Sequence, residues 1–423
     1  MANSFSKEER VAFEDILEGF NDALVLSRNV SKYGSDQTMM ERTNDIIWRP
    51  QPYIAQSFSG MDQSANFKDN TQLSVPATIG FSRSVPWVMD AKQLRDALQE
   101  QRLGKAAYQK LASDINVAIM NVAANTGTLV VKRTSAAQGF DDVAQCDTIF
   151  NEQGVQSFGR YLALSSRDYN GMANNLQVAS RSFGNSKSDR AYEKAYVGEV
   201  ASFQTYKLDY ANRLQAAAGG AGLTINTLAA GANYYVPRAT SLAVTGETSN
   251  VDNRFQRVTI SSTTNVSAGD AFTIAGVNAV HHITKGDTGQ LKTFRVISVD
   301  SATTMTISPP IISNQGGSDA EAQYQNVVVT PSATASIVFL NTVASSINPF
   351  WQEDALEILP GRYAVPSDAG TAVMRGTTEQ GVELVMQKWY DIDTMKIKYR
   401  VDTLFGVVNK QPEMSGILIF SQV

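Results

Sequence analysis

One long helical stretch constrains this chain more than any other feature. From Ala91 to Asn125 the sequence contains no proline, and at 1.5 Å per residue a helix of that length would reach about 50 Å. Asp90 is placed to cap its N-terminus, Gly127 to end it, and Gly104 to kink or split it. The apolar face of its second part is formed by Leu111, Ile115, Ala118, Ile119 and Val122. We therefore expect an extended spine and not an element of a compact bundle.

Two unusual segments precede the spine. Residues 6–28 predict an amphipathic helix that opens with the capping box Ser6 and Glu9. From Gln51 to Arg83 the chain is polar, with apolar residues scattered singly, as in a long extended loop or hairpin. An apolar helix face and a long loop both need covering, which favours contacts with a neighbouring chain. The apolar face of the helix would consist of Phe13, Ile16, Leu17, Phe20 and Leu24.

After about residue 225 the sequence changes to short alternating runs of Thr, Ser and Val separated by turn signals. Several short strands at near-regular spacing predict an antiparallel barrel or sandwich, inserted at about residues 225–342. The expected strands are Phe255–Ile260, Ala271–Ile274, Phe294–Val299, Met305–Ser308 and Asn326–Thr330.

Mixed helix and strand patterns flank this insert. Leu129–Lys132 and Tyr161–Leu164 read as short strands before it. After it, Met395 to Asp402 alternate between apolar and charged residues, and a last strand is expected at Ile417–Phe420. The chain as a whole is expected to be α+β.

Residue types that usually carry chemistry are few and poorly placed. Cys146 is the only cysteine, so no intrachain disulfide can form. His281 and His282 are adjacent, and on a strand they would point to opposite faces, where they could not bind one metal ion together. Asp391 and Asp393 lack the glutamate that closes a calcium loop, so they predict a turn. No phosphate-binding glycine loop occurs, and we expect no catalytic, cofactor-binding or metal site.

Charge and hydropathy exclude further classes. The chain has 36 Lys and Arg against 41 Asp and Glu, a net charge of -5, with no long basic run. Tight binding to nucleic acid normally needs a basic surface. The first ten residues are charged where a secretion signal needs an apolar core, and no run of about 18 apolar residues occurs. The sequence predicts neither export nor membrane insertion.

The order of these segments, with several short motifs, resembles the major coat (capsid) proteins of short-tailed temperate double-stranded DNA bacteriophages. The resemblance covers nearly the whole chain and is patchy between about 130 and 215. It implies the tailed-phage major capsid fold: an N-terminal arm, an extended loop, a peripheral domain with a long spine helix, an axial α/β domain and an inserted antiparallel β-barrel domain. The motifs are Asn44–Pro50, Leu94–Gly127, Asn250–Phe255, Gly269–Val277 and Phe350–Ala355.

The resemblance also implies domain limits. The arm would cover residues 1–45, the loop with its flanking strands 46–88, the spine 89–130, the first part of the axial domain 131–224, the insert 225–342, the axial return 343–385 and the terminal peripheral strands 386–423.

A structural role is what the resemblance implies, without enzymatic activity or a cofactor. Copies of such a chain would assemble in the host bacterial cytoplasm, with a scaffolding protein and a portal protein, into an icosahedral procapsid of pentamers and hexamers. This homo-oligomer would expand on DNA packaging and, as the virion capsid, enclose double-stranded DNA without sequence-specific binding. No membrane would be involved.

Two sets of residues are expected to contact other subunits. Phe13, Leu17 and Phe20 would do so from the arm. The loop 245–250 carries only Glu247 as a charge, whereas the family often has a more charged loop that contacts the neighbouring capsomer. Salt bridges through Glu247, hydrogen bonds, or contacts through Asp252 and Arg254 all stay open. Expansion implies bending of the spine, with Gly104 as the expected hinge.

Two other classes of protein stay open. The Thr- and Ser-rich insert also fits a β-rich surface or carbohydrate-binding protein, although no secretion signal supports it. An enzyme with an accessory β-domain is not excluded, because paired carboxylates cannot be found from spacing alone.

Overall fold

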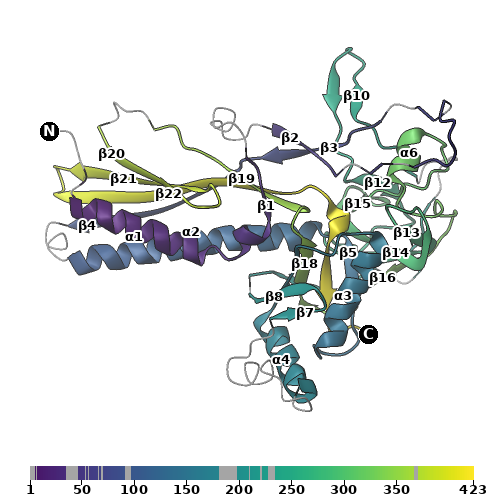
Figure 1. The fold of residues 1–423 in the computed structure, drawn as a ribbon, viewed down its shortest axis with the longest axis horizontal. Coiled ribbons are helices and arrows are strands. Elements are labelled where there is room, and N and C mark those ends of the chain that lie inside the picture. Colours follow the sequence, from purple (N-terminus) through teal and green to yellow (C-terminus); the bar gives the residue numbers. More distant parts are fainter. Residues whose placement is uncertain are drawn as a thin grey trace. The chain divides into compact units, whose positions relative to one another are not determined.

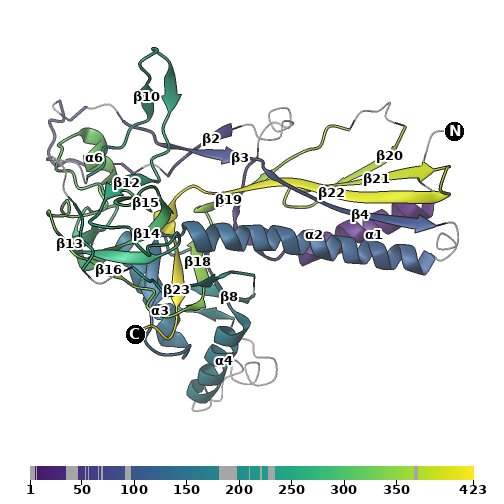
Figure 2. The ribbon, with the colours of Figure 1, turned by 180° about the vertical axis from the view of Figure 1, so that it is seen from behind.

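The computed structural model of the chain forms two compact units, which are described one at a time (Figures 1 and 2). Unit 1 comprises residues 1–47, 77–120 and 356–408, and unit 2 comprises residues 48–76, 121–355 and 409–423. The structure describes residues 5, 7–34, 46–52, 54–55, 57–64, 66–67, 70–90, 97–180, 198–208, 210–219, 222–226, 234–365 and 370–423. Its helices are α1 (Lys7–Ala23), η1 (Leu26–Asn29), α2 (Ala97–Thr126), α3 (Phe140–Gln153), α4 (Ser166–Ser180), α6 (Asp319–Tyr324) and η4 (Pro412–Met414).

A six-stranded sheet organises unit 1. Its order is β1-β19-β22-β21-β20, and β4 also pairs with β22. The predicted alternation is confirmed from Lys396 to Val401, where Ile397 and Tyr399 are buried and Lys398 between them is exposed. It is wrong at its two ends, because Met395 precedes the strand and is exposed, and Asp402 is buried. The strands are β1 (Ser31–Lys32), β4 (Phe81–Asp90), β19 (Leu356–Pro360), β20 (Ala372–Thr377), β21 (Glu383–Asp391) and β22 (Lys396–Asn409).

Helix α1 packs against α2 within unit 1, and both ribbon views show the two helices side by side (Figures 1 and 2). A Cβ atom on Gly104 of α2 would lie 2.6 Å from Ile16 Cδ1, and one on Gly19 would lie 2.7 Å from the Tyr108 ring. Glycines therefore let the two helices approach. The predicted spine is found, and α2 runs through Gly104 as one helix, so the expected split is wrong. Asp90 ends β4, and residues 91–96 lie outside the described part.

A second six-stranded sheet, with α3 packed on it, forms part of unit 2. Its order is β5-β23-β18-β6-β8-β7. The rings of Phe150, Phe203 and Phe350 meet in its core, with centroids 5.1 to 6.1 Å apart. The strands are β5 (Leu129–Lys132), β6 (Arg160–Leu164), β7 (Glu199–Val200), β8 (Phe203–Lys207), β18 (Asn348–Gln352) and β23 (Ser415–Ile419).

Five further strands of unit 2 form a small barrel. They are β12 (Gln256–Thr259), β13 (Ala271–Val280), β14 (Asp287–Val299), β15 (Thr304–Ser308) and β16 (Ile337–Phe339), in the order β12-β15-β14-β13-β16. Residues 223–226 close it, because Ile337 donates to Leu223 on one side and Asn226 donates to Thr259 on the other. The predicted strand Asn326–Thr330 is wrong: only an isolated bridge, Ala279 to Val327, forms there.

Three pairs of short strands complete the fold. They are β2 (Ile46–Pro50) with β3 (Ser74–Thr78), β9 (Arg213–Leu214) with β17 (Ser345–Ser346), and β10 (Thr240–Leu242) with β11 (Thr248–Asn250). We call residues 51–73 the long loop and residues 240–250 the hairpin. Every residue of β10 and β11 is exposed, and the hairpin stands away from the barrel in both ribbon views (Figures 1 and 2).

Candidate functional site: a buried junction of three segments

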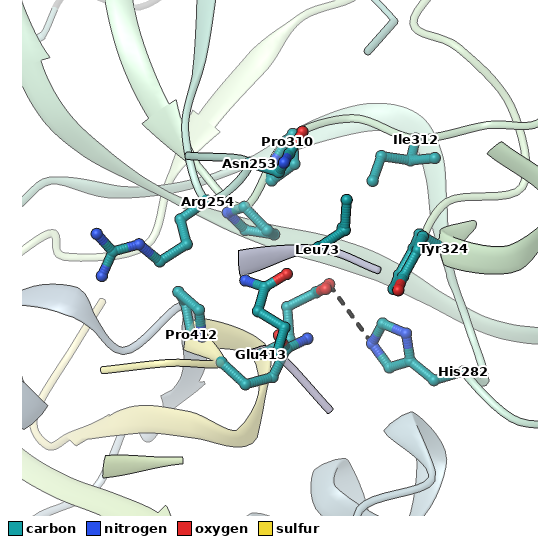
Figure 3. A pocket seen from close by; sticks show the side chains of 12 residues that line it. Leu73, Asn253, Arg254, His282, Pro310, Ile312, Tyr324, Pro412 and Glu413 are labelled. Atoms are coloured by element: carbon teal, nitrogen blue, oxygen red, sulfur yellow. Dashed lines mark ion pairs between the residues drawn. The ribbon is translucent and has the colours of Figure 1, made fainter. Parts of the chain in front are cut away.

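Three segments that are far apart in the sequence meet inside unit 2 around a cavity of about 30 Å³. We call this meeting point the junction. A cavity this small contrasts with the roughly 300 to 1,000 Å³ of small-molecule sites, so the junction is built for packing. The long loop supplies Gln51 and Leu73, the C-terminal segment Gln411, Pro412 and Glu413, and the barrel region Asn253, Arg254, His282, Pro309, Pro310, Ile312 and Tyr324 (Figure 3).

A buried carboxylate, Glu413 in η4, lies at the junction. Lys292 of β14 donates to its Oε1, and Asn326 Nδ2 donates to the same oxygen at 3.2 Å. Lys292 is itself buried and donates at 3.0 Å to Gln153 of α3. Burial alone would raise the pKa of Glu413, but the charges of Lys292 and His282 outweigh it and hold that pKa far below its usual range. One ion pair therefore ties the barrel to the C-terminal segment.

The two histidines lie in a turn and not on the strand that their sequence position allowed. His282 Nε2 is 3.5 Å from Glu413 Oε1 (Figure 3), longer than an ordinary hydrogen bond, so Lys292 is the principal partner of Glu413. His281 Nδ1 accepts from the backbone N–H groups of Ile283 and Thr284. The two rings serve different partners and do not share a ligand.

Two polar side chains hold the backbone around this ion pair. Asn326 donates to Pro310 O and accepts from the N–H of Ile312. Lys285 donates to the carbonyls of Gln323 and Gln325, at the C-terminal end of α6. Burial lowers the pKa of Lys285 to about 8, although the charge of Glu413 opposes the shift. The backbone groups that surround the junction are thus bonded by side chains.

A second buried cation joins the barrel to the end of α2. Arg295 of β14 donates to Gly269 O within the barrel, and to Ala124 O and Gly127 O at 3.1 and 3.2 Å. The last carbonyls of a helix lack partners in the helix and carry partial negative charge. Burial lowers the pKa of Arg295 to about 10, with the charge of Asp270 opposing. Arg295 therefore caps the predicted spine.

Asp252, Asn253 and Arg254 lie where the hairpin returns to the barrel. Arg254 forms a two-pronged ion pair with Asp252, at 2.9 and 2.6 Å, and donates to Asn409 O at 2.9 Å. The side chain of Arg254 is only 11% exposed. Both side chains are bonded inside the chain, and a contact of this pair with another subunit stays a prediction.

The long loop is anchored at its base. Leu73, Ile54, Ile312, Tyr324 and Tyr235 form one apolar cluster. The hydroxyl of Tyr324 donates to Thr71 O at 2.8 Å, and the side chain of Gln51 donates to Lys410 O at 3.0 Å. The expected long loop is found at residues 51–73, with its base packed and with Met61 and Phe67 exposed beyond the base.

The arm residues singled out from the sequence are not brought to the junction. Phe13 and Phe20 are buried within unit 1, and a Cβ atom on Gly376 of β20 would touch Phe13 and Leu17. The premise that the chain cannot cover this apolar face is therefore wrong. Glu247, at the turn of the hairpin, is exposed.

Sequence reasoning missed the junction. Lys292 and Glu413 are 121 residues apart, and neither lies in a motif. A weak signal existed for Lys292, because by period-two spacing it shares a face of its strand with the apolar Phe294 and Val296. Nothing in the spacing identifies its partner. Contacts between distant segments are the part that a pattern along the chain does not encode.

The other residues that the sequence offered for chemistry form neither a reactive thiol nor a metal site in the described part of the chain. Burial raises the pKa of the Cys146 thiol, far from the reactive range. Asp391 and Asp393 form a turn, with Asp391 accepting from the N–H of Asp393. Among the residues that the structure describes, no three His, Cys, Asp or Glu side chains are grouped to bind a metal ion. None of the described helices combines the length and apolarity of a membrane span.

Comparison with known proteins places the chain in a family over almost its whole length. The sequence model of the family described as "P22 coat protein - gene protein 5" matches residues 1–421.

Solved structures give more distant likenesses. A chain of Mycobacterium phage Che8 is 9% identical, with 93% of this chain and 90% of that chain covered and a TM-score of 0.44. A capsid chain of the cyanophage P-SCSP1u is 10% identical, with coverage of 92% and 85% and a TM-score of 0.42. The CUS-3 coat protein I-domain is 38% identical over 29% of this chain and 98% of its own, with a TM-score of 0.23. These TM-scores are low, so the assignment to a family rests on the family match alone.

Proposed function

Because the chain belongs to the P22 coat protein family, whose members are structural major capsid proteins of tailed phages, we propose that it builds an icosahedral procapsid of pentamers and hexamers. This shell would form with a scaffolding protein and a portal protein in the host cytoplasm. It would expand on DNA packaging to enclose double-stranded DNA. The observation that carries the proposal is the family match over residues 1–421.

A purely structural role is supported by the character of the site. The junction joins segments through buried ion pairs and hydrogen bonds around a cavity of only about 30 Å³. Larger cavities of about 440 and 490 Å³ lie elsewhere in the chain, and no metal-binding group of side chains occurs among the described residues. We propose that the chain has no catalytic activity and takes no cofactor. The alternative of a β-rich surface or carbohydrate-binding protein gains no support from the family match.

Enclosed DNA would be held without sequence-specific contacts. The net charge of -5 and the absence of a long basic run leave little to neutralise phosphates. A wall that bound phosphates tightly would oppose filling and release of the genome, so weak binding suits a container.

Contacts between subunits are proposed for surfaces that the chain leaves uncovered. On the hairpin these are Glu247 with the apolar Leu242 and Val244, which are 72% and 108% exposed. On the arm they lie on the outer face of α1, where Glu14 and Glu18 are exposed, because Phe13, Leu17 and Phe20 face inward. Many weak contacts of this kind, repeated around closed symmetry, give a stable shell.

We also propose that α2 bends at Gly104 during expansion, and the test must allow for the packing of Ile16 against this glycine. Gly104→Ala alone is ambiguous, because its methyl group would collide with Ile16. The double variant Gly104→Ala with Ile16→Val removes the colliding Cδ1 and keeps the stiffer helix. Slower or incomplete expansion of shells made from the double variant supports a hinge; normal expansion rejects it.

Electron microscopy tests the function itself. The chain is expressed with and without a scaffolding protein from the same genome and examined by negative staining. Uniform round shells that depend on the scaffolding protein are the expected result. Small oligomers under both conditions, across salt and protein concentration, would contradict a coat-protein role.

A further inference from the structure

Asn253 holds the base of the hairpin with every hydrogen-bonding group of its side chain. Its Oδ1 accepts from the Tyr235 hydroxyl and from the N–H of Arg238, each at 3.0 Å. Its Nδ2 donates to Arg238 O at 2.8 Å and to Val251 O at 3.0 Å. Asn253 is 4% exposed. One buried amide therefore ties together both strands that lead into the hairpin.

The neighbours of Asn253 in the sequence reach two other segments. Asp252 forms a parallel β-bridge with Ser74, the first residue of β3. Arg254 donates to Asn409 O, and its remaining bonds go to Asp252. Three consecutive residues thus contact the hairpin, the first residue of β3, which directly follows the long loop, and the C-terminal segment.

The base of the long loop is also linked to Asn253, through Tyr235. Leu73 packs in the cluster that contains Tyr235 and Tyr324, and Tyr235 is the residue that donates to Asn253. The burial of Tyr235 raises the pKa of its phenol, with the charge of Asp252 adding to the shift, so the phenol stays a donor. A path therefore runs from Thr71 to Tyr324, through the apolar cluster against which Tyr235 packs, and from Tyr235 to Asn253.

We infer that Asp252, Asn253 and Arg254 hold the hairpin and the long loop in a fixed orientation to one another, so that the two segments move together. Residues joined by consecutive peptide bonds cannot follow one partner and release another, because neighbouring Cα atoms stay 3.8 Å apart. A displacement of the hairpin base therefore moves the bridge to Ser74, and a displacement of the loop base moves Tyr235. Coupling of this kind is reciprocal.

The consequence builds on the proposed coat function. Two exposed elements that contact neighbouring subunits would change orientation together, so a neighbour that moves the hairpin also moves the long loop. The coupling itself is a property of one chain. It can be measured on unassembled protein, and its failure is distinct from a failure to form shells.

Hydrogen exchange of the unassembled chain tests the coupling. Asn253→Ala is expected to increase exchange about tenfold or more in residues 240–250, since several hydrogen bonds are lost. The decisive readout is a rise of at least about threefold in residues 70–74, while amides of the barrel core, such as those of Phe272 and Phe294, keep their protection.

Two further variants separate coupling from local damage. Gly246→Ala strains a residue with φ of 86° at the hairpin turn and does not touch the base; it should loosen the hairpin and leave residues 70–74 unchanged. Tyr324→Phe removes the hydroxyl that donates to Thr71 O and should raise exchange at residues 248–251 as well as in the loop.

Arg254→Lys provides a milder variant if Asn253→Ala fails to fold, because lysine keeps the charge and loses the two-pronged pair with Asp252. Increased exchange confined to the hairpin in both Asn253→Ala and Arg254→Lys would overturn the inference. So would an equal rise at residues 70–74 in Gly246→Ala.

Discussion

The barrel and the hairpin belong to the same unit and are ordered by opposite means. The barrel encloses a continuous apolar core in which Phe272 and Phe294 are fully buried, with ring centroids 5.6 Å apart. The hairpin has no core: both of its strands are exposed throughout. An isolated two-stranded hairpin is marginal in water. Its order must come from its base, where the bonds of Asn253 are polar and buried.

The difference implies that the stability of unit 2 and the orientation of the hairpin depend on different residues. Substitutions in the barrel should change the free energy of unfolding, because they remove packed apolar surface. Substitutions at the hairpin base should change the orientation of the hairpin. Substitutions at its tip should change neither the free energy of unfolding nor that orientation. The junction combines both roles, since its ion pair is buried like a core and yet joins separate segments.

Phe294→Ala should have the largest effect. The ring is fully buried and stacks on Phe272, so its removal should cost about 3 to 5 kcal/mol in the free energy of unfolding. Urea unfolding of the unassembled chain, followed by far-UV circular dichroism, measures the change. A cost below about 1 kcal/mol would mean that the barrel contributes little to the stability of unit 2.

Lys292→Met should cost about 3 kcal/mol, because it leaves the buried Glu413 without its cation. Replacing both partners should be much less harmful than replacing one. The double variant Lys292→Met with Glu413→Gln is therefore the control, and its unfolding free energy should recover most of the loss. A double variant as unstable as Lys292→Met alone would show that the lysine acts through packing and not through charge.

The same ion pair predicts a dependence on pH. The pKa of Glu413 in the folded chain lies below its value of about 4.3 in an unfolded chain. A carboxylate with a lowered pKa stabilises the fold above the unfolded pKa, and that contribution is lost as the pH falls. Unfolding free energy should thus decrease from about pH 5 downward, and less steeply in Glu413→Gln. Parallel curves for the two proteins would remove Glu413 from the acid response.

The sequence predicted much of the fold because local periodicity encodes it. The alternation of β22, the strands β5 and β6, and the long helix α2 all follow patterns that depend on neighbouring residues. Helix α3 was not predicted, because residues 129–220 mix weak signals. The predicted strand at Asn326–Thr330 is reduced to a bridge: Asn326 O and the Val328 N–H bond β13, while the Asn326 side chain bonds Ile312 and Pro310.

The junction could not be predicted, because its partners are brought together only by the completed fold. Asp252 and Arg254 are predicted from the sequence as contacts to another subunit, but the sequence does not say that their spacing of two residues lets them bond each other. Phe13 and Phe20 were correctly placed on an apolar face, yet the sequence does not say that β20 covers that face with a glycine. Periodicity shows which face is apolar; the tertiary fold decides what covers it.

Val244→Ser at the hairpin tip should have the smallest effect on stability. Val244 is fully exposed, so the free energy of unfolding should stay within about 0.5 kcal/mol of the parent chain. If the tip contacts a neighbouring subunit, the same change should lower the fraction of chain found in shells by sedimentation. Val338→Ser is the matched control, because Val338 is also exposed, at 54%, but lies on the barrel strand β16. Equal assembly of the two variants would show that the hairpin tip makes no contact that matters for the shell. A loss confined to Val244→Ser would show that this part of the chain, which adds nothing to folding, is kept for assembly.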